Sequence, residues 1–332
     1  MKNKVALVSG CTGQDAAYLS EFLLDKGYRV IGGSRRGAER TYWRLKHLDI
    51  DDKVEIVDFD LLDSENMRDV IRKYKPDEIY NLAAMSFVGT SFRQPRLTLL
   101  TNGVAVCDLL EIVRQELPKC RFYQASTSEL YGTNPKNPQD EDINFLPASP
   151  YGYAKMLAHN ACRVYRESYG MFVSCGILFN HESPLRGEEF VTQKIANYVK
   201  TLIDQDKPLE LGNMYAKRDW GFAGDYVKAM WKMMQLDSPD DFVVATGETH
   251  TVKEFIEEAF GVVGIELRWV GEGIDEVGYD KKTDRVLVKI SEKFYRPNEV
   301  DVLLGDSSKA QKTFGWKPEV SFRDLVRMMV VE

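Results

Sequence analysis

The sequence predicts an α/β protein built on a doubly wound parallel sheet, with a second and smaller α/β lobe. Three observations lead to this prediction. Short apolar runs alternate with longer amphipathic stretches through the first half of the chain, and a glycine-rich turn follows the first apolar run. The 332 residues are also enough for one large or two unequal lobes. Such alternation is typical of parallel strands joined by right-handed helical crossovers.

The first predicted strand and helix enclose the glycine-rich turn. Residues 4–9 (KVALVS) form a short apolar run of the kind found in buried parallel strands. Gly10 would allow a tight turn, and Gly13 would let backbone amides approach a pyrophosphate at the start of a helix that ends at Gly27. Ala16 stands at the third glycine position of this motif, where a small residue suffices. The pattern indicates a Rossmann-type dinucleotide site, with a plain turn as the alternative.

The second predicted strand, residues 29–34 (RVIGGS), ends at two basic residues. Folds that bind NAD usually place an acidic residue near this point, where it contacts the ribose hydroxyls. Here Arg35 and Arg36 follow the strand instead. Guanidinium groups can pair with a 2′-phosphate that a carboxylate would repel, so the sequence favours NADP over NAD. The alternative interpretation is a solvated basic loop.

The other elements follow in order along the chain. Further strands are predicted at residues 54–58, 78–83, 121–126, 172–179 and 241–246, the last as a return to the sheet. Amphipathic helices are predicted at residues 97–116 and 151–169. A further helix would be N-capped by Ser64 and would end before Pro76. Residues 1–180, with 215–250 returning, would form the larger lobe, and residues 181–214 and 251–332 the smaller one.

Five residues near the fifth predicted strand suggest acid–base chemistry. Tyr151 and Lys155 are four apart, so on a helix they lie on one face. A lysine ammonium beneath a phenol would lower the tyrosine pKa and make Tyr151 a base near neutral pH. Glu129 offers a group for a second proton transfer. It lies with Thr127 just beyond the strand's carboxyl end, where such sheets bind ligands. Capping of the following turn is the alternative role for Thr127 and for Ser128.

Composition argues against several classes of protein. The net charge of −7 and the pI near 5.4 argue against nucleic-acid binding. No apolar run approaches the roughly 18 residues of a membrane span, and we expect no signal peptide because the chain enters a strand at once. The five cysteines lack metal-ligand spacing, so we expect reduced thiols, no bound metal and a cytoplasmic location.

Together these motifs resemble the extended short-chain dehydrogenase/reductase superfamily and, within it, the GDP-mannose 4,6-dehydratase family. The glycine turn and the Tyr-x-x-x-Lys pair are common to many sugar epimerases and reductases. The STSE string at 126–129 and the NHESPLRG string at 180–187 are narrower. The similarity covers nearly the whole chain, through GCTGQD (10–15), SFVGTSF (86–92), QASTSELYG (124–132), SPYGYAK (149–155), LFNHESPLRG (178–187), FVTQKI (190–195), AKRDWG (216–221), ATGE (245–248), FYRPNEVDVLLGD (294–306) and GWKP (315–318).

The resemblance implies an internal redox reaction that dehydrates GDP-mannose with NADP, and a smaller lobe that binds the GDP-sugar. Tyr151 would take the proton of the C4 hydroxyl while C4 gives hydride to the cofactor. Thr127 would hydrogen-bond the oxygen at C4. Glu129 would remove the C5 proton and help the C6 hydroxyl to leave. Lys155 would bind the nicotinamide ribose.

The resemblance also implies further contacts and an oligomer. Cofactor contacts are implied at Gly10, Thr12, Gly13, Gln14, Asp15, Arg35, Arg36, Asp60, Leu61, Leu82, Ala83, Ser86, Tyr151, Lys155, His181 and Arg186. Substrate contacts are implied at Ser86, Ser128, Asn180, Lys194, Arg218, Arg296 and Glu299. Trp220 is predicted to be a core residue rather than a platform for a base. A homodimer or homotetramer is implied, with no nucleic-acid or membrane partner.

The chain departs from the family pattern at two positions. Met85 stands where glutamine is usual, and Ala16 where glycine is usual. Because Met85 adjoins Ser86, it predicts an altered sugar pocket, so a GDP-manno-heptose 4,6-dehydratase is an alternative. A reductase or epimerase of GDP-4-keto-6-deoxysugars is another, although it would not need Glu129. A non-catalytic NADP-binding scaffold is disfavoured by the intact candidate catalytic residues.

Overall fold

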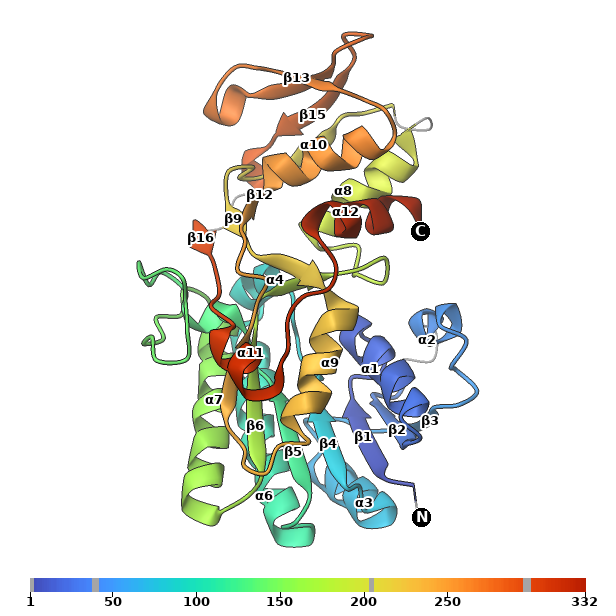
Figure 1. The fold of residues 1–332 in the computed structure, drawn as a ribbon, viewed down its shortest axis with the longest axis vertical. Helices are drawn as coiled ribbons and strands as arrows, with labels where there is room; N and C mark the ends of the chain where they lie inside the picture. Colours follow the sequence, from blue (N-terminus) through green and yellow to red (C-terminus); the bar gives the residue numbers. More distant parts are fainter. Residues whose placement is uncertain (1–2, 38–41, 203–205, 295–299) are drawn as a thin grey trace.

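The computed structural model describes residues 3–37, 42–202, 206–294 and 300–332. Two of the implied substrate contacts, Arg296 and Glu299, lie outside the described residues. The described chain forms a larger lobe around one parallel sheet and a smaller lobe above it in Figure 1. No helix in the described ranges combines the length and the apolar character that crossing a membrane requires.

A seven-stranded sheet forms the centre of the larger lobe (Figure 1), and every neighbouring pair of its strands is parallel. The spatial order is β11-β6-β5-β4-β1-β2-β3. The strands are β1 (Val5–Ser9), β2 (Arg29–Ser34), β3 (Glu55–Asp58), β4 (Glu78–Asn81), β5 (Arg121–Ala125), β6 (Val173–Leu178) and β11 (Asp241–Val244). The predicted sheet and the return of the 241–246 segment are confirmed. The order reverses direction between β1 and β4, which makes their carboxyl ends a topological switch point.

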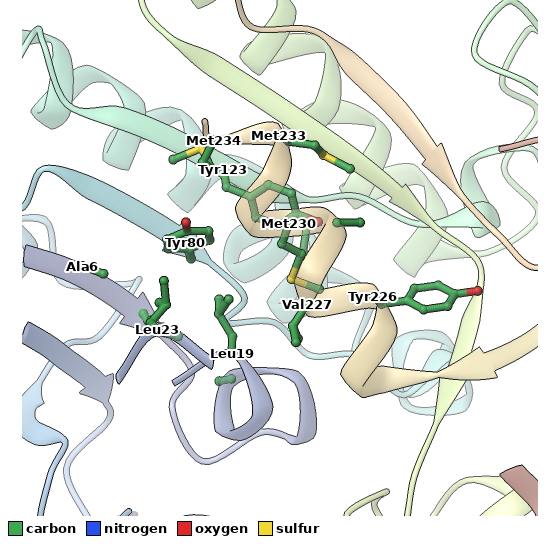
Figure 2. Packing of buried hydrophobic residues seen from close by; sticks show 14 of the residues in the cluster. Ala6, Leu19, Leu23, Tyr80, Tyr123, Tyr226, Val227, Met230, Met233 and Met234 are labelled. Atoms are coloured by element: carbon green, nitrogen blue, oxygen red, sulfur yellow. The ribbon is translucent and has the colours of Figure 1, made fainter. Parts of the chain in front are cut away.

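Helices cover both faces of this sheet. One layer contains α1 (Gln14–Asp25), α9 (Ala223–Met233) and α11 (Ser308–Phe314), and the opposite layer contains α3 (Ser64–Tyr74), α6 (Ala105–Glu116) and α7 (Pro150–Tyr169). Figure 2 shows Leu19 and Leu23 of α1 and Met230 of α9 packed near Tyr80 and Tyr123 of the sheet. Because both faces are covered, most residues of β1, β4, β5 and β6 are buried whichever face they point to, and each of these strands contains a short apolar stretch.

The structure corrects the predicted cap of α3. Asp63, not Ser64, is the N-cap: its backbone is extended, and its carboxylate accepts a hydrogen bond from the N–H of Asn66 at 3.0 Å. Ser64 is the first helical residue. The predicted end of the helix is confirmed, since Lys75 adopts a left-handed conformation with φ of 46° immediately before Pro76.

The predicted helix at 97–116 is interrupted. It consists of α5 (Pro95–Leu99), a π-helical turn (Leu100–Val104) and α6. Within the π-helical turn, Asn102 bonds the backbone N–H and carbonyl of Met85 at 2.8 and 3.0 Å. An added Cβ at Gly103 would lie 3.0 Å from the carbonyl oxygen of Ala154. The interruption therefore coincides with tertiary contacts, which the helical periodicity of the sequence does not record.

The smaller lobe combines a mixed sheet with three helices (Figure 1). The sheet order is β13-β14-β15-β8, from β13 (Leu267–Val270), β14 (Val277–Asp280), β15 (Val286–Ile290) and β8 (Leu209–Leu211). The helices α8 (Val191–Lys200), α10 (Val252–Val262) and α12 (Phe322–Val331) share one apolar core. Trp220 is 3 % exposed and belongs to this core, as predicted.

Short strands connect the two lobes. β7 (Asn180–Glu182) pairs in parallel with β10 (Trp220–Phe222), and β9 (Lys217–Arg218) lies between β12 (His250–Thr251) and β16 (Val302–Leu303). The short helices α2 (Trp43–His47) and α4 (Val88–Arg93) follow β2 and β4. The connecting strands therefore carry polar residues of the NHESPLRG and AKRDWG strings to the boundary between the lobes.

Candidate active site

The predicted glycine turn follows β1 directly. Gly10 has a φ of +70°, and an added Cβ would lie 2.8 Å from the Cα of Ala83, so only glycine fits there. The N–H of Gly13 donates to the carbonyl of Gly10 at 2.9 Å, and α1 begins at Gln14. Ala16 is 1 % exposed and packs within the core. The turn therefore presents the start of α1, with its unpaired N–H groups, at the switch point.

A cavity of about 210 Å³ lies at this edge of the sheet, and its walls bring most of the predicted residues together. All four candidate catalytic groups come from the turn after β5 and the start of α7. The predicted residues in the walls are Gly10, Gly13, Gln14, Asp15, Leu82, Ser86, Thr127, Ser128, Glu129, Tyr151, Lys155, Asn180, His181, Arg186 and Arg218.

The other implied cofactor residues lie outside these walls. Arg35 and Arg36 follow β2, Asp60 and Leu61 lie just beyond β3, and Thr12 and Ala83 flank the glycine turn. All six follow the carboxyl ends of strands β1 to β4, which are neighbours in the sheet. They therefore lie along the same edge of the sheet as the cavity but outside its walls.

Local sequence places Tyr151 and Lys155 on the first turns of α7. Ser149 caps the helix by accepting a hydrogen bond from the N–H of Gly152 at 3.0 Å. Lys155 Nζ donates to the carbonyl of Ala125 at 2.9 Å and lies 5.9 Å from the centroid of the Tyr151 ring. Burial lowers the pKa of Lys155 to about 8, so its charge is sensitive to mildly alkaline pH.

The structure contradicts the predicted pKa of Tyr151. Burial raises the pKa of Tyr151 above its ordinary value, a hydrogen bond from Thr127 opposes this, and the nearby carboxylate of Glu129 adds to it. The prediction that Lys155 lowers the pKa of Tyr151 is therefore wrong for the protein without bound ligands. The reason is geometric: the lysine ammonium bonds the Ala125 carbonyl, and its charge does not offset the burial of the phenol.

Thr127 caps the turn that follows β5, which is the alternative role predicted for it. Its Oγ1 caps the short helix Ser128–Leu130 by accepting a hydrogen bond from the N–H of Glu129 at 3.2 Å. The Thr127 hydroxyl also opposes the rise in the pKa of Tyr151. Its contact with the C4 oxygen of the substrate stays a prediction. Ser128 is 3 % exposed and lines the cavity, but the cap belongs to Thr127.

Three of the implied cofactor residues bind one another. His181 Nε2 lies 2.7 Å from Asp15 Oδ2, and its Nδ1 lies 2.7 Å from the carbonyl of Phe179. Both partners only accept, so the arrangement favours the imidazolium. Burial opposes this charge pair, yet Asp15 raises the pKa of His181, and His181 lowers the pKa of Asp15 to about 2. Gln14 joins the group by donating to the carbonyl of His181 at 3.1 Å.

Two arginines adjoin this ion pair. Arg186 Nε lies 2.9 Å from Glu182 Oε2, and its guanidinium lies 3.5 Å from the centroid of the Phe190 ring. Arg44, which the sequence did not single out, donates to the carbonyls of Thr12 at 2.8 Å and Leu185 at 2.6 Å. Arg44 therefore connects the glycine turn to the loop after β7 through two hydrogen bonds. No sequence motif predicts this contact.

A second cavity, of about 640 Å³, adjoins the first and shares Phe87, Asn180, Phe190 and Arg218 with it. Its walls also contain Lys194, another implied substrate contact, which donates to the carbonyl of Glu210 and lies 3.8 Å from the centroid of the Phe294 ring. The Oδ1 atom of Asn180 is buried and has no hydrogen-bond partner among the described residues. It therefore remains available to a ligand.

The sequence missed several residues of the second cavity. Two of them, Arg93 and Lys293, add positive charge to that of Lys194 and Arg218. The other three are aromatic residues in the walls of this cavity: Phe87, Phe190 and Phe294. The SFVGTSF string contains Phe87 but gives no indication of its role. Phe87 and Phe190 come from different segments and pack edge to face, with centroids 5.7 Å apart.

Met85 does not occupy the place predicted for it. Among the described residues, the walls of the first cavity include Ala84 and Ser86 but not Met85, and the second cavity does not include it either. Its backbone is held on both sides by Asn102.

The Rossmann sheet, the glycine turn at its switch point and the Tyr151–Lys155 pair define a nucleotide-dependent enzyme of the extended short-chain dehydrogenase/reductase class. Solved structures of this class share the fold. The dTDP-glucose 4,6-dehydratase DesIV of Streptomyces venezuelae, with NAD and TYD bound, matches with a TM-score of 0.82 at 21 % identity, covering 98 % of this chain and 95 % of that one.

The family is narrower than the class. The family model described as GDP-mannose 4,6 dehydratase matches residues 7–329. GDP-mannose 4,6-dehydratase of Sinorhizobium fredii is 47 % identical over 99 % of this chain and 96 % of its own length. GDP-mannose 4,6 dehydratase of Homo sapiens is 48 % identical, over 98 % of this chain and 90 % of its own length. This chain belongs to the GDP-mannose 4,6-dehydratase family, whose members are hydro-lyases.

Proposed function

We propose that the protein converts GDP-mannose to GDP-4-keto-6-deoxymannose and water, using NADP as a cofactor that is restored in each cycle. One observation carries the proposal. Tyr151 and Glu129, which come from different elements, line one cavity together with Thr127 and Lys155. That cavity adjoins a larger one, whose walls include Lys194 and Arg218 as partners for the substrate diphosphate.

The two proton-transfer groups suit two successive steps. The cofactor would accept hydride from C4 of the sugar and return it at C6. Tyr151, as its phenolate, would take the proton of the C4 hydroxyl, and the Thr127 hydroxyl would hydrogen-bond the oxygen. The resulting ketone acidifies C5–H, which Glu129 would remove before protonating the departing C6 hydroxyl. When hydride returns to C6, a proton would return to C5, which completes the 4-keto-6-deoxy sugar. Each proton transfer contributes roughly 10²–10⁴-fold to the rate.

Two substitutions separate these roles. Tyr151→Phe should abolish both hydride transfer and dehydration, because oxidation at C4 comes first. Glu129→Gln should allow oxidation but block elimination, so reduced cofactor should accumulate. Single-turnover absorbance with GDP-mannose measures the accumulation. Identical traces without reduced cofactor in both variants would contradict the assignment.

The preference for NADP rests on the end of β2. The guanidinium of Arg36 pairs with Asp58 at 2.7 Å, whereas Arg35 is exposed and forms no ion pair with any residue that the structure describes. Arg35 is therefore the group we assign to the 2′-phosphate. Arg35→Ala should weaken NADP binding at least about tenfold and change NAD binding little, because a charged hydrogen bond contributes about 1.5–3 kcal/mol. Arg36→Ala is the matched control, with a smaller expected effect.

The smaller lobe and the strands that connect it to the larger lobe would supply the substrate contacts. Lys194 and Arg218 would neutralise the diphosphate of the GDP-sugar, and Asn180 would offer its free Oδ1 to the sugar or ribose. We assign residues 181–214 and 251–332 mainly to this lobe, although residues 308–316 pack back against the larger lobe through Ala310 and Trp316. Incubation with GDP-, ADP-, UDP- and dTDP-sugars, followed by product analysis by mass and NMR, tests the preference for GDP.

The alternatives receive less support from this geometry. The GDP-manno-heptose dehydratase depended on Met85 in the sugar pocket, and Met85 lies outside both sets of walls. A reductase or epimerase would leave Glu129 without a role, yet Glu129 is only 9 % exposed and lines the cavity. A carboxylate buried at that place is best explained by elimination chemistry.

An exposed apolar face supports the proposed dimer. Adjoining helical segments at 95–104 and 150–169 expose large apolar side chains between 37 and 55 %: Leu97, Val104, Tyr153, Leu157 and Val164. Such a contiguous face is typical of protein interfaces. Leu157→Glu should convert the oligomer to monomer in light scattering. All five cysteines are free, which supports the proposed cytoplasmic location.

A further inference from the structure

A buried polar chain lies behind the candidate catalytic residues. Ser126 Oγ lies 2.9 Å from His159 Nδ1, and His159 Nε2 lies 3.5 Å from Asp241 Oδ2. Arg166 bonds both carboxylate oxygens of Asp241, at 2.7 and 2.8 Å. Ser126 and His159 are only 4 % and 5 % exposed. The proposed reaction uses none of these residues, so their burial and pairing need a separate explanation.

His159 lies on the same face of α7 as the catalytic pair. It follows Lys155 by four residues, as Lys155 follows Tyr151, so all three point the same way. Lys155 bonds the carbonyl of Ala125, and His159 contacts the hydroxyl of Ser126. Helix α7 therefore holds two successive residues at the end of β5, immediately before the turn that carries the catalytic threonine and glutamate.

A third contact joins α7 to the segment that follows β5. An added Cβ at Gly152 would lie 2.6 Å from the carbonyl oxygen of Glu129, so α7 touches the turn backbone directly. Gly152, Lys155 and His159 are spaced as i, i+3 and i+7, which forms one stripe along a helix. The stripe meets residues 125–129 at three points. These three contacts therefore fix the position of residues 125–129 relative to the α7 residues Tyr151 and Lys155.

Two other uses of the chain agree less well with its geometry. His159, Cys175 and Asp241 place ligand atoms within 4.8 Å of one another, but the guanidinium of Arg166 already occupies both oxygens of Asp241 and would repel a cation. A nucleophilic triad presents Nε2 to the serine and Nδ1 to the aspartate. Here the two nitrogens are reversed, and the approach to Asp241 is long.

We infer that His159 is a positioning residue that acts through Ser126: it anchors the 126–129 segment to α7, so that Glu129 and Tyr151 keep the separation that both steps require. This inference rests on the proposed function. Asp241, itself held by Arg166, anchors the far side of the imidazole. Catalytic geometry is sensitive to such anchoring, because a misplacement of about 1 Å can cost about 100-fold in rate.

Three variants test the contact between His159 and Ser126. His159→Asn places an amide near the position of Nδ1 and can still bond Ser126, whereas His159→Gln places it near Nε2 and cannot. Ser126→Ala removes the other partner. With GDP-mannose and NADP, His159→Gln and Ser126→Ala should each lower kcat about tenfold with KM within about twofold, and His159→Asn should recover most of the loss. The double variant Ser126→Ala/His159→Gln should be no slower than either single variant, because the two act as one unit.

Val113→Ala is the control for lost stability. Val113 lies on α6, is fully buried and does not line the cavity, so its truncation should lower Tm without changing kcat. Unchanged kcat in His159→Gln and Ser126→Ala, additive losses in the double variant, or no recovery by His159→Asn would each overturn the inference.

A second measurement does not depend on the reaction. The N–H groups of Glu129, Leu130 and Tyr131 are bonded within the turn itself, so hydrogen exchange reports its order directly. His159→Gln should speed exchange at residues 129–131 by at least about tenfold, whereas Val113→Ala should not. Unchanged exchange would overturn the inference even if the natural chain failed to convert GDP-mannose. That failure, with faster exchange in His159→Gln, would contradict the proposed function alone.

Discussion

Gly152→Ala should damage catalysis far more than stability. The added Cβ would lie 2.6 Å from the carbonyl oxygen of Glu129, and such contacts do not fall below about 3.0 Å and are ordinarily near 3.4 Å. Helix α7 and the turn after β5 must therefore separate by about 0.4–0.8 Å. Tyr151 moves with the helix and Glu129 with the turn, so the substitution changes the distance between the two proton-transfer groups.

The two energetic effects differ in size. Overpacking costs about 1–3 kcal/mol, and alanine regains about 1 kcal/mol of helix propensity over glycine, so the free energy of unfolding should fall by only about 0–2 kcal/mol. If a displacement of about 1 Å costs about 100-fold in rate, half of that distance should lower kcat about tenfold. The loss should appear in kcat rather than in KM, because the second cavity is untouched.

Gly170→Ala is the matched control on the same helix. Gly170 ends α7 with a φ of +63°, and an added Cβ would meet no atom within 4 Å. Backbone strain should cost about 1–2 kcal/mol of stability without moving Tyr151. Steady-state kinetics and urea denaturation of both variants test the reasoning. A kcat for Gly152→Ala within twofold of the natural chain, or an equal loss for Gly170→Ala, would refute it.

Three further predictions follow from the corrected local structure. His181→Gln removes the partner of Asp15 and so removes the stability that their ion pair gives the natural chain. In the natural chain, the contribution of Asp15 to the free energy of unfolding is lost as pH falls from about 3.8 to about 2. The contribution of His181 is lost as pH rises beyond about 6.5 through its raised pKa. The stability difference, about 2 kcal/mol, should therefore be greatest between about pH 4 and 6.5, and urea titrations that show no pH dependence would contradict this. Asp63→Ala should lower the free energy of unfolding by about 1 kcal/mol while Ser64→Ala changes it by less than about 0.5 kcal/mol, and equal losses would argue against Asp63 as the cap. Met85→Gln should change the ratio of kcat/KM for GDP-mannose to that for GDP-manno-heptose by less than about twofold. A tenfold change in this ratio, about 1.4 kcal/mol, would show that Met85 does contact the sugar.

Local features of the sequence determined much of the sheet and the outline of the site. Short apolar stretches predicted the seven central strands, because strands covered on both faces need no strict polar alternation. Gly10 marked the turn after β1, since glycine adopts a left-handed backbone without steric cost. The spacing of Tyr151 and Lys155 placed them on one helical face, which depends only on the 3.6-residue period.

The tertiary structure alone decided how these groups interact. Asp15 and His181 are 166 positions apart, so their mutual ion pair follows from how β7 meets α1 and not from either motif. The same holds for the contact of His159 with Ser126, and for Met85, which lines neither cavity. The pKa of Tyr151 is raised because the fold buries the phenol, and burial is a property of the packed chain. Periodicity and spacing specify which face a side chain occupies, whereas its partners and its charge depend on what the rest of the protein packs against that face.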